Sequence, residues 1–310
     1  MKVLLAGGAG FLGSHLAEAL VAEGFEVDVL DNFISGSLRN LDLIRSRINI
    51  IKQDIINFSS DKEYDYILNL ASRASRPEWE RDPVGVALSN STGSTRLIDA
   101  AVKCGSLYLF ASSSEIYGNP SVIPTPESYL GSISTTGSRS PYDEGKRFGE
   151  TITKAYERQF GLRNIILRIF NTYGPRMKGD DLYGRVIDRF INEALRQIPL
   201  TVYGDGRQTR SFTYVSDTIK GIMIAIEKGK EGEVYNIGNS QEIKIIQLAE
   251  KIKIATGSSS KIVFGPLPEG DPSRRAADFS KMRELGWSPS ISIDEGIRKM
   301  IEISMGGKNI

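Results

Sequence analysis

Short apolar runs alternate with segments of helical periodicity through the first half of the chain. Each run has the length of a buried strand, and each periodic segment gathers apolar residues on one helical face. The predicted strands are residues 3–6, 26–30, 48–51, 66–70, 107–111 and 164–169, and the predicted helices are 11–23, 86–103 and 142–160. Because strands joined through helices run parallel, this order predicts an α/β fold with a doubly wound, mostly parallel sheet, in which we expect seven strands, one more than these six ranges.

The alternation of predicted strands and helices changes after about residue 172. Apolar runs become shorter, Gly and Pro become more frequent, and longer loops separate the helical segments 186–196 and 245–255. No internal repeat or low-complexity linker divides the chain. We therefore predict a sheet domain over residues 1–172 and a smaller α/β lobe over 173–310, with some later segments returning to the sheet domain.

Composition and charge argue against several kinds of partner. The 310 residues include 39 Lys and Arg and 38 Asp and Glu, which leaves a formal net charge of +1. This balance gives no electrostatic attraction to nucleic acid or an anionic membrane, and no apolar run approaches the roughly 20 residues of a membrane span. The single cysteine, Cys104, can form no internal disulfide, and the single histidine, His15, has no second histidine with which to bind a metal. We expect a cytoplasmic protein with no metal centre and no nucleic-acid or membrane partner.

A glycine-rich turn, Gly7-Gly8-Ala9-Gly10-Phe11-Leu12-Gly13, joins the first strand to the first helix. Glycines allow the backbone to approach a phosphate at the helix N-terminus, and the strand–turn–helix context supports dinucleotide binding. Asp31, at the end of the second strand, would accept hydrogen bonds from the ribose hydroxyls of NAD and repel the 2′-phosphate of NADP. The plainer alternative is that Asp31 only begins a polar loop. Asp54, after the third strand, is a candidate for bonding the adenine.

Tyr142 and Lys146 occupy positions i and i+4 of a predicted helix, so the phenol and the ammonium group share one face. A nearby Lys and a positively charged nicotinamide both favour the phenolate, which makes Tyr142 a candidate base. Ser113, at the carboxyl end of a central strand, can hydrogen-bond the reacting hydroxyl together with Tyr142. Glu115 leads into an otherwise apolar turn, where a carboxylate is costly unless it is functional or paired.

These residues together resemble the extended short-chain dehydrogenase/reductase family, and within it the enzymes that modify nucleotide sugars. The likeness covers nearly the whole chain and includes Leu70-Ala71-Ser72, Arg168-Ile169-Phe170-Asn171-Thr172-Tyr173-Gly174-Pro175-Arg176 and Tyr214-Val215-Ser216-Asp217. It implies a Rossmann-type NAD-binding domain. The cofactor-binding residues it implies are Gly7, Gly10, Phe11, Leu12, Gly13, Asp31, Asn32, Asp54, Ile55, Leu70, Ala71, Ser72, Tyr142 and Lys146.

Within that family, the branch that this chain most resembles is that of the UDP-glucuronate decarboxylases. The motifs concerned are Ser113-Ser114-Glu115, Tyr142-Asp143-Glu144-Gly145-Lys146-Arg147 and Gln208-Thr209-Arg210-Ser211-Phe212. Sugar 4-epimerases usually have an apolar residue in place of Glu115, and 4,6-dehydratases have an Asp-Glu pair in place of Ser114 and Glu115. The chain departs from the decarboxylase pattern at Arg73 and Arg76, where that branch has prolines.

The resemblance implies a role for each matched residue. It assigns catalysis to Tyr142, Lys146, Ser113, Ser114 and Glu115, and UDP-sugar binding to Asn171, Arg185, Tyr203, Arg210 and Arg275. Tyr142 would take the C4 hydroxyl proton, CO₂ would leave from the 4-keto sugar, and Glu115 with Ser114 would position the sugar and help manage protonation at C5. Arg210 would face the C6 carboxylate while Arg275 binds the diphosphate. The alternatives are a UDP-sugar 4-epimerase, a dTDP-glucose 4,6-dehydratase and a non-catalytic NAD sensor; for Arg185, the alternative is a surface arginine.

The resemblance also implies a homodimer. In the family, the helix bearing Tyr142 and the helix before it, here 86–103, pack against their mates as a four-helix bundle. Ile98, Val102, Ile152 and Ala155 are apolar at spacings that fit either such a seam or an intramolecular core.

Overall fold

Seven parallel strands form the central sheet of the computed structural model, which describes residues 1–177, 186–267 and 271–306. The strands lie in the order β11-β6-β5-β4-β1-β2-β3. They are β1 (Lys2–Ala6), β2 (Glu26–Asp31), β3 (Ile48–Lys52), β4 (Tyr66–Asn69), β5 (Leu107–Ser113), β6 (Asn164–Ile169) and β11 (Val234–Ile237). The predicted doubly wound sheet is confirmed, and its order reverses between β1 and β4, where such sheets open a ligand crevice.

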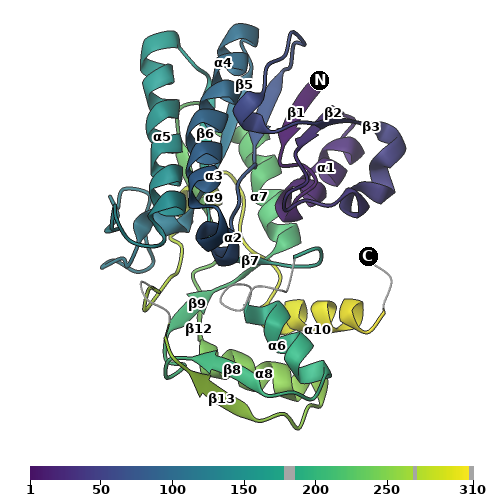
Figure 1. The fold of residues 1–310 in the computed structure, drawn as a ribbon, viewed down its shortest axis with the longest axis vertical. Coiled ribbons are helices and arrows are strands. Elements are labelled where there is room, and N and C mark those ends of the chain that lie inside the picture. Colours follow the sequence, from purple (N-terminus) through teal and green to yellow (C-terminus); the bar gives the residue numbers. More distant parts are fainter. Residues whose placement is uncertain (178–185, 268–270, 307–310) are drawn as a thin grey trace.

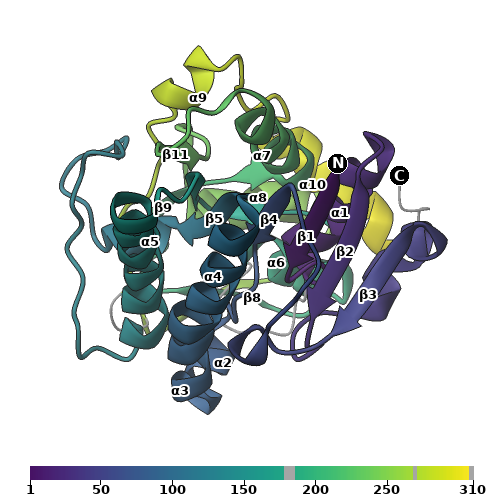
Figure 2. The ribbon, with the colours of Figure 1, turned by 90° about the horizontal axis from the view of Figure 1, so that it is seen from above.

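Helices cover both faces of the sheet (Figure 1 and Figure 2). On one face lie α1 (Phe11–Ala22) and α7 (Val215–Lys228), and on the other lie α4 (Ser94–Cys104) and α5 (Ser140–Phe160). Alternate residues of β1 belong to separate cores: Val3 and Leu5 pack in the cluster that contains α1, whereas Leu4 and Ala6 pack in the cluster that contains α4.

The predicted helix 86–103 is not one continuous α-helix. It consists of α3 (Pro83–Leu88), a π-helical turn (Ser89–Gly93) and α4. Helix α3 begins earlier than predicted because the Asp82 carboxylate accepts a hydrogen bond from the Gly85 NH at 3.0 Å and caps the helix. The π-helical turn has the polar sequence Ser-Asn-Ser-Thr-Gly, and the Ser89 hydroxyl donates back to the Gly85 carbonyl at 2.5 Å, a bond that competes with regular helix.

Helix α5 lies close against β5 (Figure 2). Gly149 permits this approach, because a Cβ atom at that position would lie 2.2 Å from Cζ of Phe110. One turn earlier, the Nζ atom of Lys146 donates to the Ala111 carbonyl at 2.7 Å. The face of α5 that carries Tyr142 and Lys146 is therefore held at the carboxyl end of β5.

The second half of the chain builds the smaller lobe and also returns to the sheet. Strand β11 pairs with β6, and α7 packs against α1, whereas the lobe at the lower end of Figure 1 contains α6, α8, α10 and two-stranded sheets. The remaining bounds are α2 (Arg76–Arg81), α6 (Val186–Leu195), α8 (Ile245–Thr256), α9 (Ser280–Glu284), α10 (Ile293–Ser304), β7 (Thr172–Tyr173), β8 (Leu200–Tyr203), β9 (Thr209–Ser211), β10 (Thr213–Tyr214), β12 (Glu242–Lys244), β13 (Ile262–Gly265) and the short 3₁₀ segments Leu38–Arg47, Ile55–Asn57 and Ser114–Tyr117. Among the described helices, none is both long and apolar enough to cross a bilayer.

Candidate active site

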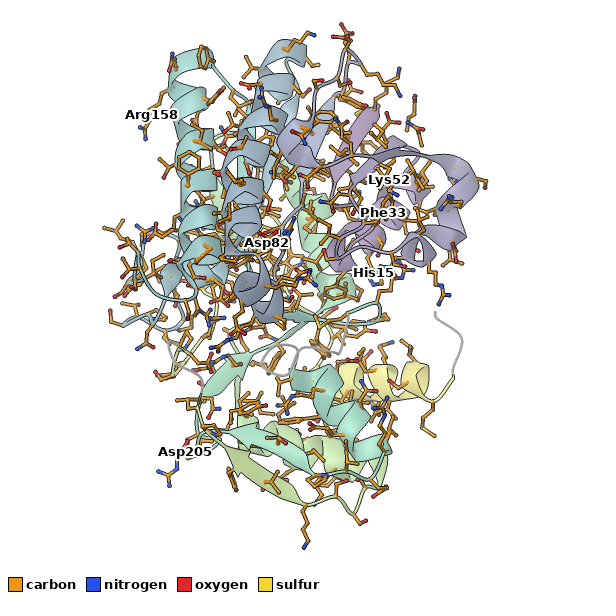
Figure 3. All side chains as sticks on the ribbon, viewed as in Figure 1. His15, Phe33, Lys52, Asp82, Arg158 and Asp205 are labelled. Atoms are coloured by element: carbon orange, nitrogen blue, oxygen red, sulfur yellow. The ribbon has the colours of Figure 1, made fainter. Side chains whose placement is uncertain are left out.

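A cavity of about 710 Å³ opens where the carboxyl ends of the strands face the smaller lobe, a junction crowded with side chains in Figure 3. The sheet contributes the glycine turn and the loops after β2, β3, β4, β5 and β6, and the lobe contributes Tyr203, Arg210 and the segment around Arg275. The predicted site residues line this one cavity, apart from Arg185, which lies outside the described residues.

The glycine turn forms a cradle that only a bare backbone can make. Gly7 has a φ of 77°, and a Cβ atom there would lie 2.7 Å from the backbone of Ala71. A Cβ atom at Gly13 would lie 2.0 Å from the Gly7 carbonyl oxygen. No side chain caps the start of α1 at Gly10, so first-turn NH groups face the cavity as phosphate donors. This cradle fits the diphosphate of a dinucleotide such as NAD.

Asp31 is fixed at the rim of the cradle. Its buried carboxylate accepts hydrogen bonds from the Ala9 NH at 2.9 Å and from the Phe33 NH at 2.8 Å. The Asp54 carboxylate accepts from the Asn32 amide at 2.7 Å and lies on the same wall of the cavity. Their positions suit an adenosine ribose and its base; these roles stay predictions.

Tyr142, Lys146 and Ser113 meet at the end of β5. Lys146 is 3% exposed, and burial lowers the pKa of its ammonium group to about 7. Burial raises the pKa of the Tyr142 phenol, an effect that its hydrogen bond with Ser113 partly offsets. In the protein alone, the Tyr142 phenol therefore keeps its proton at neutral pH, and a positively charged nicotinamide bound beside it would favour the phenolate.

Glu115 is held between two arginines. Both Arg275 terminal nitrogens donate to its carboxylate, at 2.5 and 2.7 Å, and Arg139 donates to it from the loop before α5. Although burial opposes ionisation, the charges of Arg275 and Arg139 hold the Glu115 pKa at about 2. Glu115 is therefore a carboxylate at neutral pH, which suits the predicted positioning of the sugar; its part at C5 stays a prediction.

The arginines form ion pairs within the site that the sequence did not predict, and their roles toward a ligand stay predictions. Arg275, expected on the diphosphate, forms a bidentate pair with Glu115 near the reacting end of the cavity. Arg210 donates to Asp271 at 2.7 Å. The sequence could not reveal these pairings because the partners are far apart along the chain: Glu115 and Arg275 are separated by 160 residues.

Asn171 and Tyr203 lie toward the smaller lobe. The Asn171 amide donates to the Ser211 carbonyl at 3.2 Å, and the Tyr203 ring lies 5.1 Å from the Arg189 guanidinium. Sequence reasoning had not selected Arg189, although it lines the cavity and could pair with a phosphate. The diphosphate and base roles of this group stay predictions.

Trp79 and Arg139 were also missed. The Trp79 indole stacks on the Tyr142 ring, with centroids 4.7 Å apart and planes 18° apart. The sequence contains a feature that could have identified Trp79: it is one of only two tryptophans in the chain, and it follows the Leu70-Ala71-Ser72 motif.

Cationic side chains outnumber anionic ones among the residues that line the cavity, nine to five. The cationic residues are Arg73, Arg76, Arg81, Arg139, Lys146, Arg176, Arg189, Arg210 and Arg275, and the anionic ones are Asp31, Asp54, Glu78, Glu115 and Asp271. Carboxylates just behind the lining pair with four of these arginines, Asp82 with Arg73, Glu80 with Arg76, Glu18 with Arg176 and Glu193 with Arg189, and offset the formal excess. The arginines can still bind phosphate or carboxylate groups of a ligand. No cluster of His, Cys, Asp and Glu that could hold a metal occurs within the described ranges.

Comparison with known proteins agrees with this geometry. Residues 3–238 match the NAD dependent epimerase/dehydratase family. UDP-glucuronic acid decarboxylase 1 of Arabidopsis thaliana is 41% identical over 304 residues, which cover 97% of this chain and 69% of that protein. The structure superposes on UDP-glucose 4-epimerase of Thermotoga maritima with UDP-glucose (TM-score 0.91, 32% identity, 98% and 99% of the two chains). It also superposes on UDP-glucose 4-epimerase of Thermus thermophilus in complex with NAD (TM-score 0.88, 29% identity, 99% of each chain).

The glycine cradle generates a direct prediction. The change Gly13→Ala should weaken NAD binding by at least about tenfold, because the added methyl group would collide with the Gly7 carbonyl and displace the turn. Titration calorimetry with NAD measures the change, and Glu23→Ala, at the exposed end of α1, is the control. Unchanged NAD affinity in Gly13→Ala would show that the cradle does not hold the cofactor.

Proposed function

The chain belongs to the NAD dependent epimerase/dehydratase family, and we propose that within it the protein decarboxylates UDP-glucuronate to UDP-xylose. The observation that carries this proposal is the Arg275–Glu115–Arg139 cluster beside Tyr142 and Ser113. Moving a hydride on a neutral sugar needs no such charged group, whereas a uronate brings a carboxylate to the reacting end. The arginines that line the cavity support the same substrate, because UDP-glucuronate carries one more negative charge than UDP-glucose.

Each group at the end of β5 then has a distinct task. The glycine cradle would hold NAD, which would supply the acceptor and later the donor of the hydride at C4 of the sugar. Tyr142 takes the C4 hydroxyl proton, and Ser113 hydrogen-bonds the same oxygen. The 4-ketone lies β to the carboxylate, so the C5–C6 bond can break with loss of CO₂. The electron pair of that bond passes into the C4 carbonyl. Tyr142 and Ser113 stabilise the negative charge that develops on O4, and C5 takes up a proton.

The cationic groups bind and orient the substrate in this proposal. We infer that Arg275 and Arg139, which both bond Glu115, bind the sugar carboxylate, and that Arg189, Arg210 and Asn171, which line the same cavity, bind the diphosphate. The sheet domain thus binds the cofactor and the smaller lobe the nucleotide sugar. We place this activity in the cytoplasm, where a chain whose single cysteine forms no disulfide is stable.

We further propose that the protein is a homodimer. Ile98, on α4, is fully buried in the core between that helix and the sheet, so it cannot belong to an exterior seam. Helices α3 and α5 pack together and expose other apolar side chains, namely Leu88 (40% exposed), Phe148 (43%) and Val84 (66%). Burial of these side chains against a second copy would remove a costly exposed apolar surface.

The substrate test compares UDP-glucuronate with UDP-glucose, with NAD present and products identified by mass spectrometry and proton NMR. UDP-glucuronate should lose CO₂ and yield a UDP-pentose. Tyr142→Phe, the matched control, should retain NAD but turn over orders of magnitude more slowly because it lacks the hydroxyl. Inversion at C4 with unchanged mass, from either sugar, would instead identify the protein as a 4-epimerase.

The assembly test is sedimentation at micromolar concentration. The protein should sediment as a dimer, and Phe148→Glu should shift it toward the monomer by placing a charge in the apolar seam. Phe264→Glu, which changes an exposed phenylalanine (60%) on β13, is the matched control and should leave the dimer intact. A monomeric wild-type protein would refute the proposal.

A further inference from the structure

Trp79 is the side chain that covers the proposed base. It comes from α2, is 7% exposed, lines the cavity and stacks on the Tyr142 ring. With Val86 these two rings form a small apolar cluster of their own, apart from the two large cores. The contact leaves Tyr142 only 6% exposed although it lies at the edge of a wide cavity.

The indole itself is anchored on several sides. Its Nε1–H group donates to the Arg73 carbonyl at 2.8 Å, and the Arg139 guanidinium lies 5.4 Å from its ring centroid. The Arg73 side chain pairs with Asp82, the residue that caps α3. The Arg73 carbonyl therefore holds the indole directly. The ion pair with Asp82, which also caps α3, in turn holds Arg73 in place.

We propose that Trp79 is a positioning residue for Tyr142: its indole holds the phenol ring in the orientation from which the hydroxyl reaches both Ser113 and the sugar, and it keeps bulk water from that hydroxyl. The inference rests on the proposed function, since it concerns the proton transfer at C4. A phenol attached through two rotatable bonds can swing into an open cavity, and a flat partner on one ring face prevents that motion. Ser113, at the end of β5, fixes the hydroxyl end of the same side chain.

Two replacements of Trp79 distinguish a role in stacking on Tyr142 from a role in filling space. Both Trp79→Phe and Trp79→Leu keep an apolar side chain and both lose the bond to the Arg73 carbonyl, but only phenylalanine offers a flat ring. Trp79→Leu should lower kcat for decarboxylation roughly tenfold, the rate equivalent of one aromatic pair, whereas KM changes less than about twofold. Trp79→Phe should restore most of the rate. Equal kcat values in the two variants would overturn the proposal.

The pH dependence of kcat provides a readout that loss of folded protein would not change. The titratable or charged groups around the phenol are Lys146 and Asp143 on α5, Glu115 after β5, Arg139 before α5, and Arg76, Glu78 and Arg81 on α2. Burial is the largest cause of the raised Tyr142 pKa. Water admitted by Trp79→Leu would weaken this effect of burial and lower the Tyr142 pKa, so the acid limb of the kcat profile should move to lower pH. In Trp79→Phe, which keeps the ring covered, the acid limb should not move. A limb that does not move in Trp79→Leu would overturn the shielding role.

Two controls distinguish a failure of the Trp79 proposal from a failure of the proposed decarboxylase function. Thermal unfolding and NAD content, measured on each variant, establish that the compared proteins are folded and loaded. If the wild-type protein leaves UDP-glucuronate unchanged but inverts C4 of UDP-glucose, the decarboxylase proposal fails. The same two variants then test Trp79 on epimerisation, which uses the same Tyr142 proton transfer, with the same expected and contradicting results.

Discussion

The ion pairs around Glu115 are the constraint on which the arrangement of the site depends. Glu115 follows β5, Arg139 precedes α5, and Arg275 lies in the strand-like segment that bonds to β9, where the Ser211 NH donates to the Arg275 carbonyl at 2.9 Å. One carboxylate thus ties the sheet, the helix that bears Tyr142 and the smaller lobe together. Removal of one partner from such a buried cluster leaves an unpaired charge and typically costs about 3–5 kcal/mol.

The same cluster sets the charges of its neighbours. Burial and the Glu115 charge raise the pKa of Asp143 to about 7, and one of its carboxylate oxygens has no hydrogen-bond partner in the structure. Arg139 bridges the two carboxylates, at 3.5 Å from Asp143, and also approaches the Trp79 ring. The Arg139 guanidinium thus contacts Glu115, Asp143 and the indole that stacks on Tyr142, so in the proposed function the group that binds the sugar carboxylate also borders the proposed base.

The sequence predicted the features that depend on local geometry. The glycine cradle, Asp31 at the end of β2 and the i, i+4 pair of Tyr142 and Lys146 each follow from a strand end, a tight turn or a helix period, and the cavity gathers them together. The partner of Arg275 and the stack of Trp79 on Tyr142 depend instead on loops without periodicity that meet only after folding. The π-helical turn escaped prediction because its cause is back-bonding by Ser89 within an otherwise regular helical pattern.

The most direct test of this account is a double-mutant cycle between Glu115 and Arg275, with kcat/KM for decarboxylation of UDP-glucuronate as the readout. If Glu115 acts by aligning Arg275, Glu115→Gln and Arg275→Gln should each abolish most of the activity. The double variant should then be little worse than either single one, with a coupling free energy of at least about 2 kcal/mol. Losses that multiply independently in the double variant would show that the two residues act separately, contrary to the account.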